Sequence, residues 1–140
     1  MAEICLNSVF DAVSLALHQA FPQAQVHGEE VKQGLRPGDF IVQMPAGGQA
    51  KTLGERYRRT PTVDVVYFPR RGSAECYRMA EQLALLLESV VTPEGDTLQA
   101  GECSWAYTDG ALHVQTAYEH FAYLPQEEVP METLHIDQRG

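Results

Sequence analysis

The tetrapeptide Thr-Asp-Gly-Ala at residues 108–111 constrains the fold more strongly than any other stretch of this sequence. Asp-Gly between two alternating runs is typical of a β-hairpin, because both residues of a two-residue turn can take positive φ. The register that follows pairs Tyr107 with Leu112, Trp105 with Val114, Cys103 with Thr116, Ala106 with His113, Ser104 with Gln115, and Glu102 with Ala117. The first three pairs give an aromatic and apolar face, and the others give a small and polar face, as a correct register should. The second strand is predicted to continue through Tyr118 to about Leu124.

Two segments carry apolar residues at helical spacing. The first is predicted to be capped by Asn7 or Ser8 and to end at about Ala20, because Pro22 follows. The second is predicted to start at Ser73, with Glu75 favourable in its first turn, and to end before Pro93. The apolar stripes are Val9, Phe10, Val13, Leu17 and Ala20 in the first helix, and Cys76, Met79, Ala80, Leu83, Leu86, Leu87 and Val90 in the second.

Residues 55–69 have the two-residue period of a half-buried strand. One face carries Tyr57, Val63, Val65 and Tyr67, and the other carries Arg56, Arg58, Thr60, Thr62 and Asp64. Pro61 cannot donate to a ladder, so the strand lies at an edge there or the ladder breaks. Residues 46–54, rich in Gly and Ala, are predicted to form a loop. We therefore expect residues 51–60 to project beyond the sheet as a hairpin arm.

Two shorter strands are predicted at 24–31 and 39–45, separated by the turn Leu-Arg-Pro-Gly. The predicted order is helix, strand, strand, long strand, helix, strand, strand. The predicted fold class is therefore α+β, with two amphipathic helices on one face of a mostly antiparallel sheet. We expect one domain over residues 1–124 and an acidic C-terminal tail over 125–140.

The composition predicts one soluble domain. With 140 residues, of which 44% are hydrophobic, the chain can bury a core. No apolar run approaches the roughly 20 residues that span a bilayer, and the N-terminus lacks a signal-peptide pattern, so we expect synthesis in the cytoplasm and no membrane. Cys5, Cys76 and Cys103 are odd in number, which predicts free and mostly buried thiols.

Charge is unevenly distributed in this chain of net charge -9. Residues 51–71 hold six of the ten Lys and Arg residues against two acidic residues, whereas the rest of the chain holds four basic and seventeen acidic residues. The candidate interaction residues are Lys51, Arg56, Tyr57, Arg58 and Arg59. These side chains suit an acidic protein surface or phosphate, but a solvated strand edge explains the charges equally simply.

No set of residues indicates catalysis or a metal site. The histidines lack zinc spacing, and the sequence contains no Cys-x-x-Cys, His-Glu-x-x-His, Gly-x-Ser-x-Gly or phosphate-binding glycine motif. Cys103 and His113 lie on opposite faces of the predicted hairpin, and the adjacent Glu29 and Glu30 point to opposite faces of a strand. We therefore expect no enzyme activity and no cofactor.

Three strings resemble the phage tail terminator family, in particular a small family found in phages and prophages of Gram-positive bacteria. They are FP at 21–22 followed by GEEVKQGL at 28–35, LGERYRR at 53–59 leading into DVVYFP at 64–69, and DGALHVQTAY at 109–118. The resemblance covers about residues 5–124 and does not extend into the tail.

The resemblance implies a structural virion protein without a cofactor. Such terminators form a ring, commonly a hexamer, on the head-proximal end of the tail tube, where the ring ends polymerisation and presents the head-docking surface. The implied partners are other copies of the chain, the tail tube protein, and sheath and head–neck connector proteins, while DNA passes through the lumen without specific binding. The implied location is the virion tail or neck, after assembly in the host cytoplasm.

Two other kinds of protein fit the same features. A different neck component, such as a head–tail connector or tail completion protein, would share the size, the acidity and the lack of a catalytic motif. A nucleic-acid-binding module would place the same arginines on phosphate, which the net charge of -9 disfavours.

Overall fold

The computed structural model describes residues 4–29 and 35–123, so the predicted tail at 125–140 and the end of the strand predicted at 24–31 lie outside the described residues. The helices are α1 (Leu6–Ala20) and α2 (Ser73–Leu86). The strands are β1 (Val26–His27), β2 (Phe40–Ala46), β3 (Gln49–Lys51), β4 (Arg56–Arg59), β5 (Thr62–Tyr67), β6 (Ser89–Val91), β7 (Thr97–Gln99), β8 (Cys103–Thr108), β9 (Ala111–Ala117) and β10 (His120–Tyr123).

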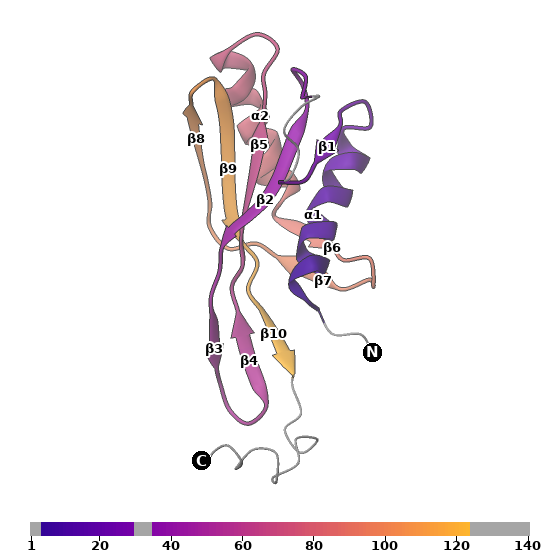
Figure 1. Cartoon of the computed structure of the whole chain (residues 1–140), viewed down its shortest axis with the longest axis vertical. Coiled ribbons are helices and arrows are strands. Elements are labelled where there is room, and N and C mark those ends of the chain that lie inside the picture. Colours follow the sequence, from indigo (N-terminus) through magenta and orange to yellow (C-terminus); the bar gives the residue numbers. More distant parts are fainter. Residues whose placement is uncertain (1–3, 30–34, 124–140) are drawn as a thin grey trace.

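The body is a five-stranded sheet of order β1-β2-β5-β9-β8, with both helices on one face (Figure 1). Helix α1 packs beside β1 and β2, and α2 packs beside β8 and β9. The described strands pair antiparallel except β1 with β2, which confirms the predicted α+β class. The core between sheet and helices is a cluster of buried apolar side chains, and its most buried members include Val9, Val13, Leu17, Phe40, Val65, Leu83 and Leu112.

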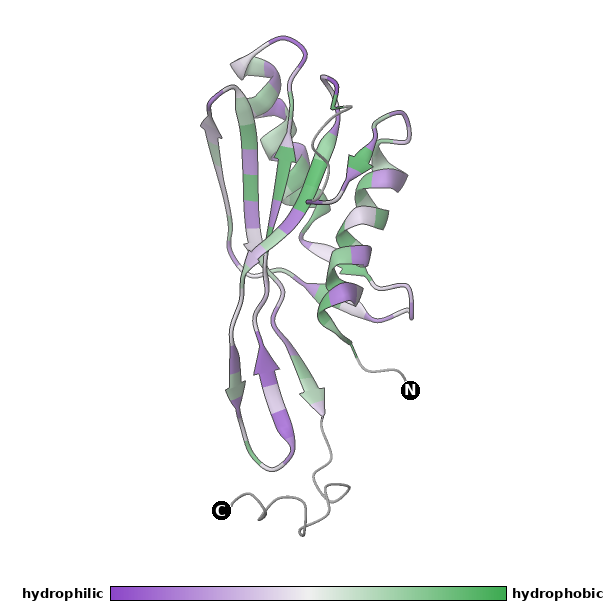
Figure 2. Ribbon diagram, viewed as in Figure 1, coloured by the Kyte–Doolittle hydropathy of each residue, from purple (hydrophilic) through white to green (hydrophobic). Residues whose placement is uncertain are grey.

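A second sheet, of order β10-β4-β3, extends from one end of the body, and we call it the arm (Figure 1). Strand β4 ends at Arg59 and β5 begins at Thr62, so the ladder breaks at Pro61, as the missing N–H requires. In Figure 2 the arm strand β4 is mostly hydrophilic, whereas the strands β2 and β5 of the body are largely hydrophobic. The two halves of the predicted long strand therefore belong to different sheets.

The loop predicted over residues 46–54 is wrong in part, because Gln49–Lys51 forms β3 and pairs with β4. All three residues of β3 are exposed. A strand that pairs with one neighbour and buries none of its side chains needs no apolar residues, so its sequence carries no periodic signal.

The Asp-Gly hairpin is confirmed in turn and register. Asp109 and Gly110 have φ of 53° and 75°, and five of the six predicted pairs are present, from Tyr107 with Leu112 to Cys103 with Thr116. The prediction that this second strand continues to Leu124 is wrong. Strand β9 ends at Ala117, and the chain then leaves the body to pair with β4 as β10.

The helix ends differ from the sequence prediction in detail. Cys5 is the N-cap of α1, and Ser8 lies inside the helix, where its hydroxyl contacts the Cys5 thiol at 3.3 Å. Cys5 is exposed, so the prediction of mostly buried thiols fails there. Helix α2 starts at Ser73 with Gly72 as its N-cap and ends at Leu86, before Val90.

A hairpin of β6 and β7 occupies residues for which the sequence analysis predicted no strands. Val90 matched the helical period by coincidence, because a buried residue of a short strand can fall in phase with a preceding helix. The turn signal Glu-Gly-Asp at 94–96 was available in the sequence.

Tyr118 joins the sheet to the end of α2. Its side chain is completely buried, and its hydroxyl donates a 2.6 Å hydrogen bond to the carbonyl of Leu87, the C-cap of α2. Burial raises the pKa of Tyr118, so the hydroxyl stays protonated as the donor. The bond satisfies a carbonyl at the helix end that has no partner within the helix.

Tyr118→Phe should lower the free energy of unfolding by about 1–2 kcal/mol, because a buried carbonyl loses its donor while packing is kept. Denaturant unfolding of the isolated protein measures the change. The matched control is Tyr107→Phe, whose side chain is 40% exposed and which should change stability by less than about 0.5 kcal/mol. Equal stability of the two variants would contradict the assigned role of Tyr118.

Candidate interaction surfaces

The candidate residues of the sequence analysis all lie on the arm, but on two faces of it. Residues directly opposite each other in antiparallel strands point to the same face. One face carries Ala50, Arg56, Arg58, Phe121 and Tyr123, and the other carries Gln49, Lys51, Tyr57 and Arg59. The structure therefore brings Arg56 and Arg58 together and separates them from Lys51, Tyr57 and Arg59.

Each arginine of β4 contacts a neighbouring strand or the connection between β9 and β10. The Arg56 guanidinium lies 4.2 Å from the ring centroid of Phe121, and Arg59 Nε donates to Gln49 Oε1 at 2.7 Å. Arg58 Nε lies 3.3 Å from Glu119 Oε2, with both side chains about half exposed. An ion pair so exposed is worth only about 0–1 kcal/mol, so Arg58 can exchange Glu119 for a partner's carboxylate at little cost.

Two aromatic residues of the arm were missed by the sequence analysis. Phe121 and Tyr123 are 47% and 56% exposed and share a face with Arg56 and Arg58. The period-2 run His-Phe-Ala-Tyr was a strand signal, but its pairing with β4 cannot be read from one sequence. This face of the arm therefore combines cations with exposed aromatic rings.

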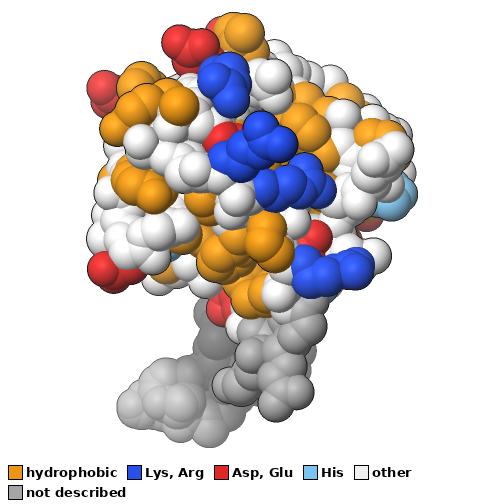
Figure 3. Space-filling view, turned by 90° about the horizontal axis from the view of Figure 1, so that it is seen from above, with side chains coloured by type: hydrophobic (Ala, Val, Ile, Leu, Met, Phe, Trp, Pro, Cys, Tyr) orange, Lys and Arg blue, Asp and Glu red, His pale blue; other side chains and the backbone are white. Residues whose placement is uncertain are grey.

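Two of the six basic residues in 51–71 do not belong to the arm. Arg70 and Arg71 follow the far end of β5, a strand of about 20 Å, so they lie at the opposite end of the body. Arg36 precedes β2 at the same end, and Arg78 lies in the second turn of α2. Figure 3 looks onto this end and shows Lys and Arg side chains gathered on it, beside hydrophobic ones. We call Arg36, Arg70, Arg71 and Arg78 the arginine end.

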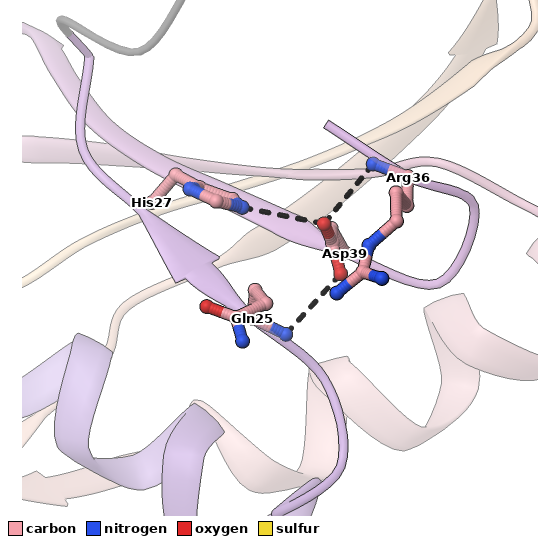
Figure 4. A network of polar contacts seen from close by, with 4 residues as sticks. All are labelled: Gln25, His27, Arg36 and Asp39. Atoms are coloured by element: carbon pink, nitrogen blue, oxygen red, sulfur yellow. Dashed lines mark hydrogen bonds and ion pairs between the residues drawn. The ribbon is translucent and has the colours of Figure 1, made fainter. Parts of the chain in front are cut away.

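A buried carboxylate fixes the backbone at the arginine end. Asp39 is 4% exposed and accepts hydrogen bonds from the backbone N–H groups of Gln25 at 3.2 Å and Arg36 at 3.0 Å, and it lies 3.3 Å from His27 Nε2 (Figure 4). Burial alone would raise the pKa of Asp39, but these donors outweigh it and lower the pKa. The carboxylate thereby joins β1 to the turn that carries Arg36.

A second carboxylate holds the turn before α2. Glu75 accepts from the backbone N–H groups of Arg70 and Arg71 and from the hydroxyl of Tyr67. Burial opposes ionisation, but the Tyr67 hydroxyl and the two N–H groups lower the pKa of Glu75. Both arginines thus have fixed backbones.

The rest of the molecule is acidic. The sequence has no Lys or Arg between Arg78 and Arg139, a stretch that includes β6 to β10. Acidic residues lie on both sides of the β6–β7 hairpin, at Glu88 and Glu102, and in its turn, at Glu94 and Asp96. Positive charge in the described residues is therefore confined mainly to the two ends of the long axis.

The face of the sheet away from the helices carries a polar network. Asp64, predicted on a polar face with Arg56 and Arg58, is only 3% exposed. Its Oδ2 accepts from Gln43 Nε2 at 2.9 Å and lies 3.1 Å from His113 Nδ1, while Oδ1 has no partner in the described part of the chain. This helix-free face is polar but largely uncharged.

Neither a metal site nor a membrane span is present among residues 4–29 and 35–123. No group of three or more His, Cys, Asp and Glu side chains there could hold an ion. Neither described helix is long and apolar enough to cross a membrane.

A family model described as phage tail terminator protein matches residues 8–130. The chain belongs to the phage tail terminator family. The family is structural rather than enzymatic, which gives this member a role in completing the phage tail and a place in the virion tail.

Two other comparisons add little to the family assignment. One similar solved structure aligns over 86% of this chain and 93% of its own length, with 14% identity and a TM-score of 0.47. None of the curated proteins matches the sequence significantly.

Asp39→Asn should destabilise the protein by about 1–3 kcal/mol near neutral pH, because buried N–H donors lose an ionised acceptor. The lowered pKa means that the stabilisation is complete above the pKa of an unfolded Asp, about 3.9, and is lost as pH falls through the folded value. The stability gap between variant and wild type should therefore shrink below about pH 4. Denaturant unfolding at several pH values, with the exposed Asp11→Asn as control, measures it. A gap independent of pH would show that Asp39 acts only through packing.

Proposed function

We propose that this terminator forms a homo-oligomeric ring, with a hexamer as the expected state, on the head-proximal end of a phage tail tube. The ring ends tube polymerisation and presents the surface onto which the head docks. The observation that supports this most is the family match over residues 8–130, which includes the body and the arm. The partners proposed are other copies of the chain, the tail tube protein, and sheath and head–neck connector proteins.

The charge distribution supports the ring. A closed ring requires each subunit to present two different, complementary surfaces to its neighbours. The arm supplies Lys51, Arg56, Arg58 and Arg59, with Tyr57 beside them, and the stretch from β6 to β9 supplies acidic residues without a Lys or Arg. Because each exposed ion pair contributes about 0–1 kcal/mol, the arm would set register and encounter rate more than affinity.

The two ends of the long axis suit different partners. The arm combines arginines with Phe121 and Tyr123, and the arginine end lies on the far side of the body. A terminator has to meet a tube on one side and the head or neck on the other, so chemically different ends are expected. The largely uncharged helix-free face suits a lumen through which DNA passes without specific binding.

The second candidate is another neck component, such as a head–tail connector or tail completion protein. The arginine end favours this candidate, because its four arginines suit an acidic neck protein as the main partner in place of a tube. Both candidates are structural, and they differ in what happens when the protein is missing.

Electron microscopy of tails from a phage or prophage with this gene deleted separates the two candidates. Loss of a terminator should give overlong tails of scattered length without heads, because nothing stops addition of tube subunits. Tails of normal length that fail to join heads would move the protein to the connector class. Intact virions would remove it from tail assembly.

Replacing Arg56, Arg58 and Arg59 together with Ala should weaken assembly, most strongly at low salt, where charges are least screened. The matched control replaces Arg70, Arg71 and Arg78 with Ala, which removes the same charge from the arginine end and should leave tail length normal. Two measurements apply to both variants: tail length after complementation of the deletion, and assembly of the purified subunit on isolated tail tubes at low and high salt. Normal tails together with unchanged assembly of the arm variant at both salt concentrations would contradict the proposed role of the arm.

A further inference from the structure

Strand β8 forms one edge of the five-stranded sheet. It pairs with β9 on one side, and no described strand lies on its other side. All its residues except Cys103 are exposed, including Trp105 at 56% and Tyr107 at 40%.

The outer side of β8 presents backbone groups that pair with no strand among residues 4–29 and 35–123. A two-residue turn makes Thr108 and Ala111 a hydrogen-bonded pair, and such pairs alternate along an antiparallel ladder. The backbone N–H and C=O groups of Cys103, Trp105 and Tyr107 therefore point away from β9. The ladder with β9 has no register shift over these residues, so the edge is regular.

This edge lacks the features that normally keep sheet edges apart. Natural edge strands are protected by charged residues, proline, bulges or shortness. Strand β8, Cys-Ser-Trp-Ala-Tyr-Thr, has six residues, no charge and no proline. Such a strand is expected to be covered by another strand in the functional state.

Helix α2 extends the exposed apolar surface beside β8. Tyr77 is 56% exposed and follows the buried Cys76. Met79 and Leu86 lie on the flank of α2 that lines hollows with α1, so Tyr77 lies on the opposite flank, toward β8. Trp105 and Tyr107 share the helix side of the sheet with Leu112 and Val114. The edge therefore has an aromatic surface next to its free backbone groups.

We propose that β3 in the arm of a second copy adds as a strand to β8. This inference rests on the proposed ring and names the contact between its neighbouring subunits. Strand β3 is itself an edge strand, and its residues are all exposed. Thr60 N donates to Gly48 O and Thr52 N donates to Arg56 O, so the alternate residues Gln49 and Lys51 direct their backbone groups away from β4. Both edges thus offer matching rows of donors and acceptors.

Charge favours β3 over the edges of the β6–β7 hairpin. Glu102 and Asp109 flank β8, and β3 carries Lys51 beside the arginines of β4. The β6–β7 hairpin is flanked by acidic residues, which would repel β8. Arginines of the arm can also lie over Trp105 and Tyr107, a favourable cation–π arrangement.

Symmetric pairing of β8 with β8 of a second copy fits less well. The outward backbone groups allow only registers that match these residues with one another, such as Cys103 opposite Tyr107 of the other copy in a pair centred on Trp105. A symmetric pair closes as a dimer, whereas pairing of β8 with β3 leaves one edge of each kind free on every subunit to propagate a ring.

Cysteine cross-linking in purified tails tests the pairing. The variant carries Trp105→Cys and Gln49→Cys with Cys5→Ser and Cys103→Ser, and is treated with a short bis-maleimide. We expect a ladder of covalent oligomers above the dimer on a denaturing gel. Each single cysteine should give monomers, and so should Trp105→Cys with Gln99→Cys, which tests the β7 edge. Dimers from Trp105→Cys alone would establish symmetric pairing and overturn the proposal.

Amide hydrogen exchange of the unmodified protein gives a second readout that does not depend on the variants folding. Four amides should exchange in the monomer and become protected in tails: those of Trp105, Tyr107, Gln49 and Lys51. The amides of Ser104 and Ala106 should be protected in both states. Unchanged exchange of Trp105 and Tyr107 in tails of normal length would overturn the strand pairing while leaving the terminator function intact. Overlong tails in the deletion are the separate test of that function.

Discussion

The ladder that joins β5 to β2 and β9 determines where the arm and the turn that carries Arg70 and Arg71 lie. Its residues are buried from Val63 to Tyr67, and its two neighbours continue, through short connections, into β3 and β10 of the arm. Pro61 interrupts the ladder at one end, and the turn held by Glu75 follows it at the other. One central strand thereby carries the arm at one end and the arginine end at the other, and a shift in its register would move both.

The parts of the fold that were predictable are those in which side chains alone specify structure. The Asp-Gly turn fixed a register because only small or permissive residues tolerate positive φ at both positions, and the stripes of α1 and α2 follow from burial on one face. Strands β3, β6, β7 and β10 were not predicted as separate elements. They are short, and they depend on backbone pairing with segments distant in sequence, which leaves little mark on local composition.

The candidate surface shows the same limit. Composition located Lys51, Arg56, Tyr57, Arg58 and Arg59, and all five lie in the arm. Composition could not separate these residues into two faces, and it could not show that Arg70 and Arg71 lie outside the arm. Both require knowing where the long predicted strand breaks and which strands pair with its two halves. Phe121 and Tyr123 join Arg56 and Arg58 only through the register of β10 with β4, a contact between residues more than sixty positions apart.

A sheet edge and a charged arm on one subunit have a consequence for assembly. Each exposed ion pair contributes about 0–1 kcal/mol, and pairing of a three-residue edge strand adds only a few backbone hydrogen bonds at about 1 kcal/mol each. One such contact between two subunits would not offset the translational and rotational entropy lost on association, which is estimated at 4 kcal/mol or more. A closed ring adds a contact without a further loss of this kind, and a tube end that gathers subunits raises their effective concentration. Weak, directional contacts of the proposed kind would therefore favour a subunit that stays dispersed until a finished tube gathers it into the ring.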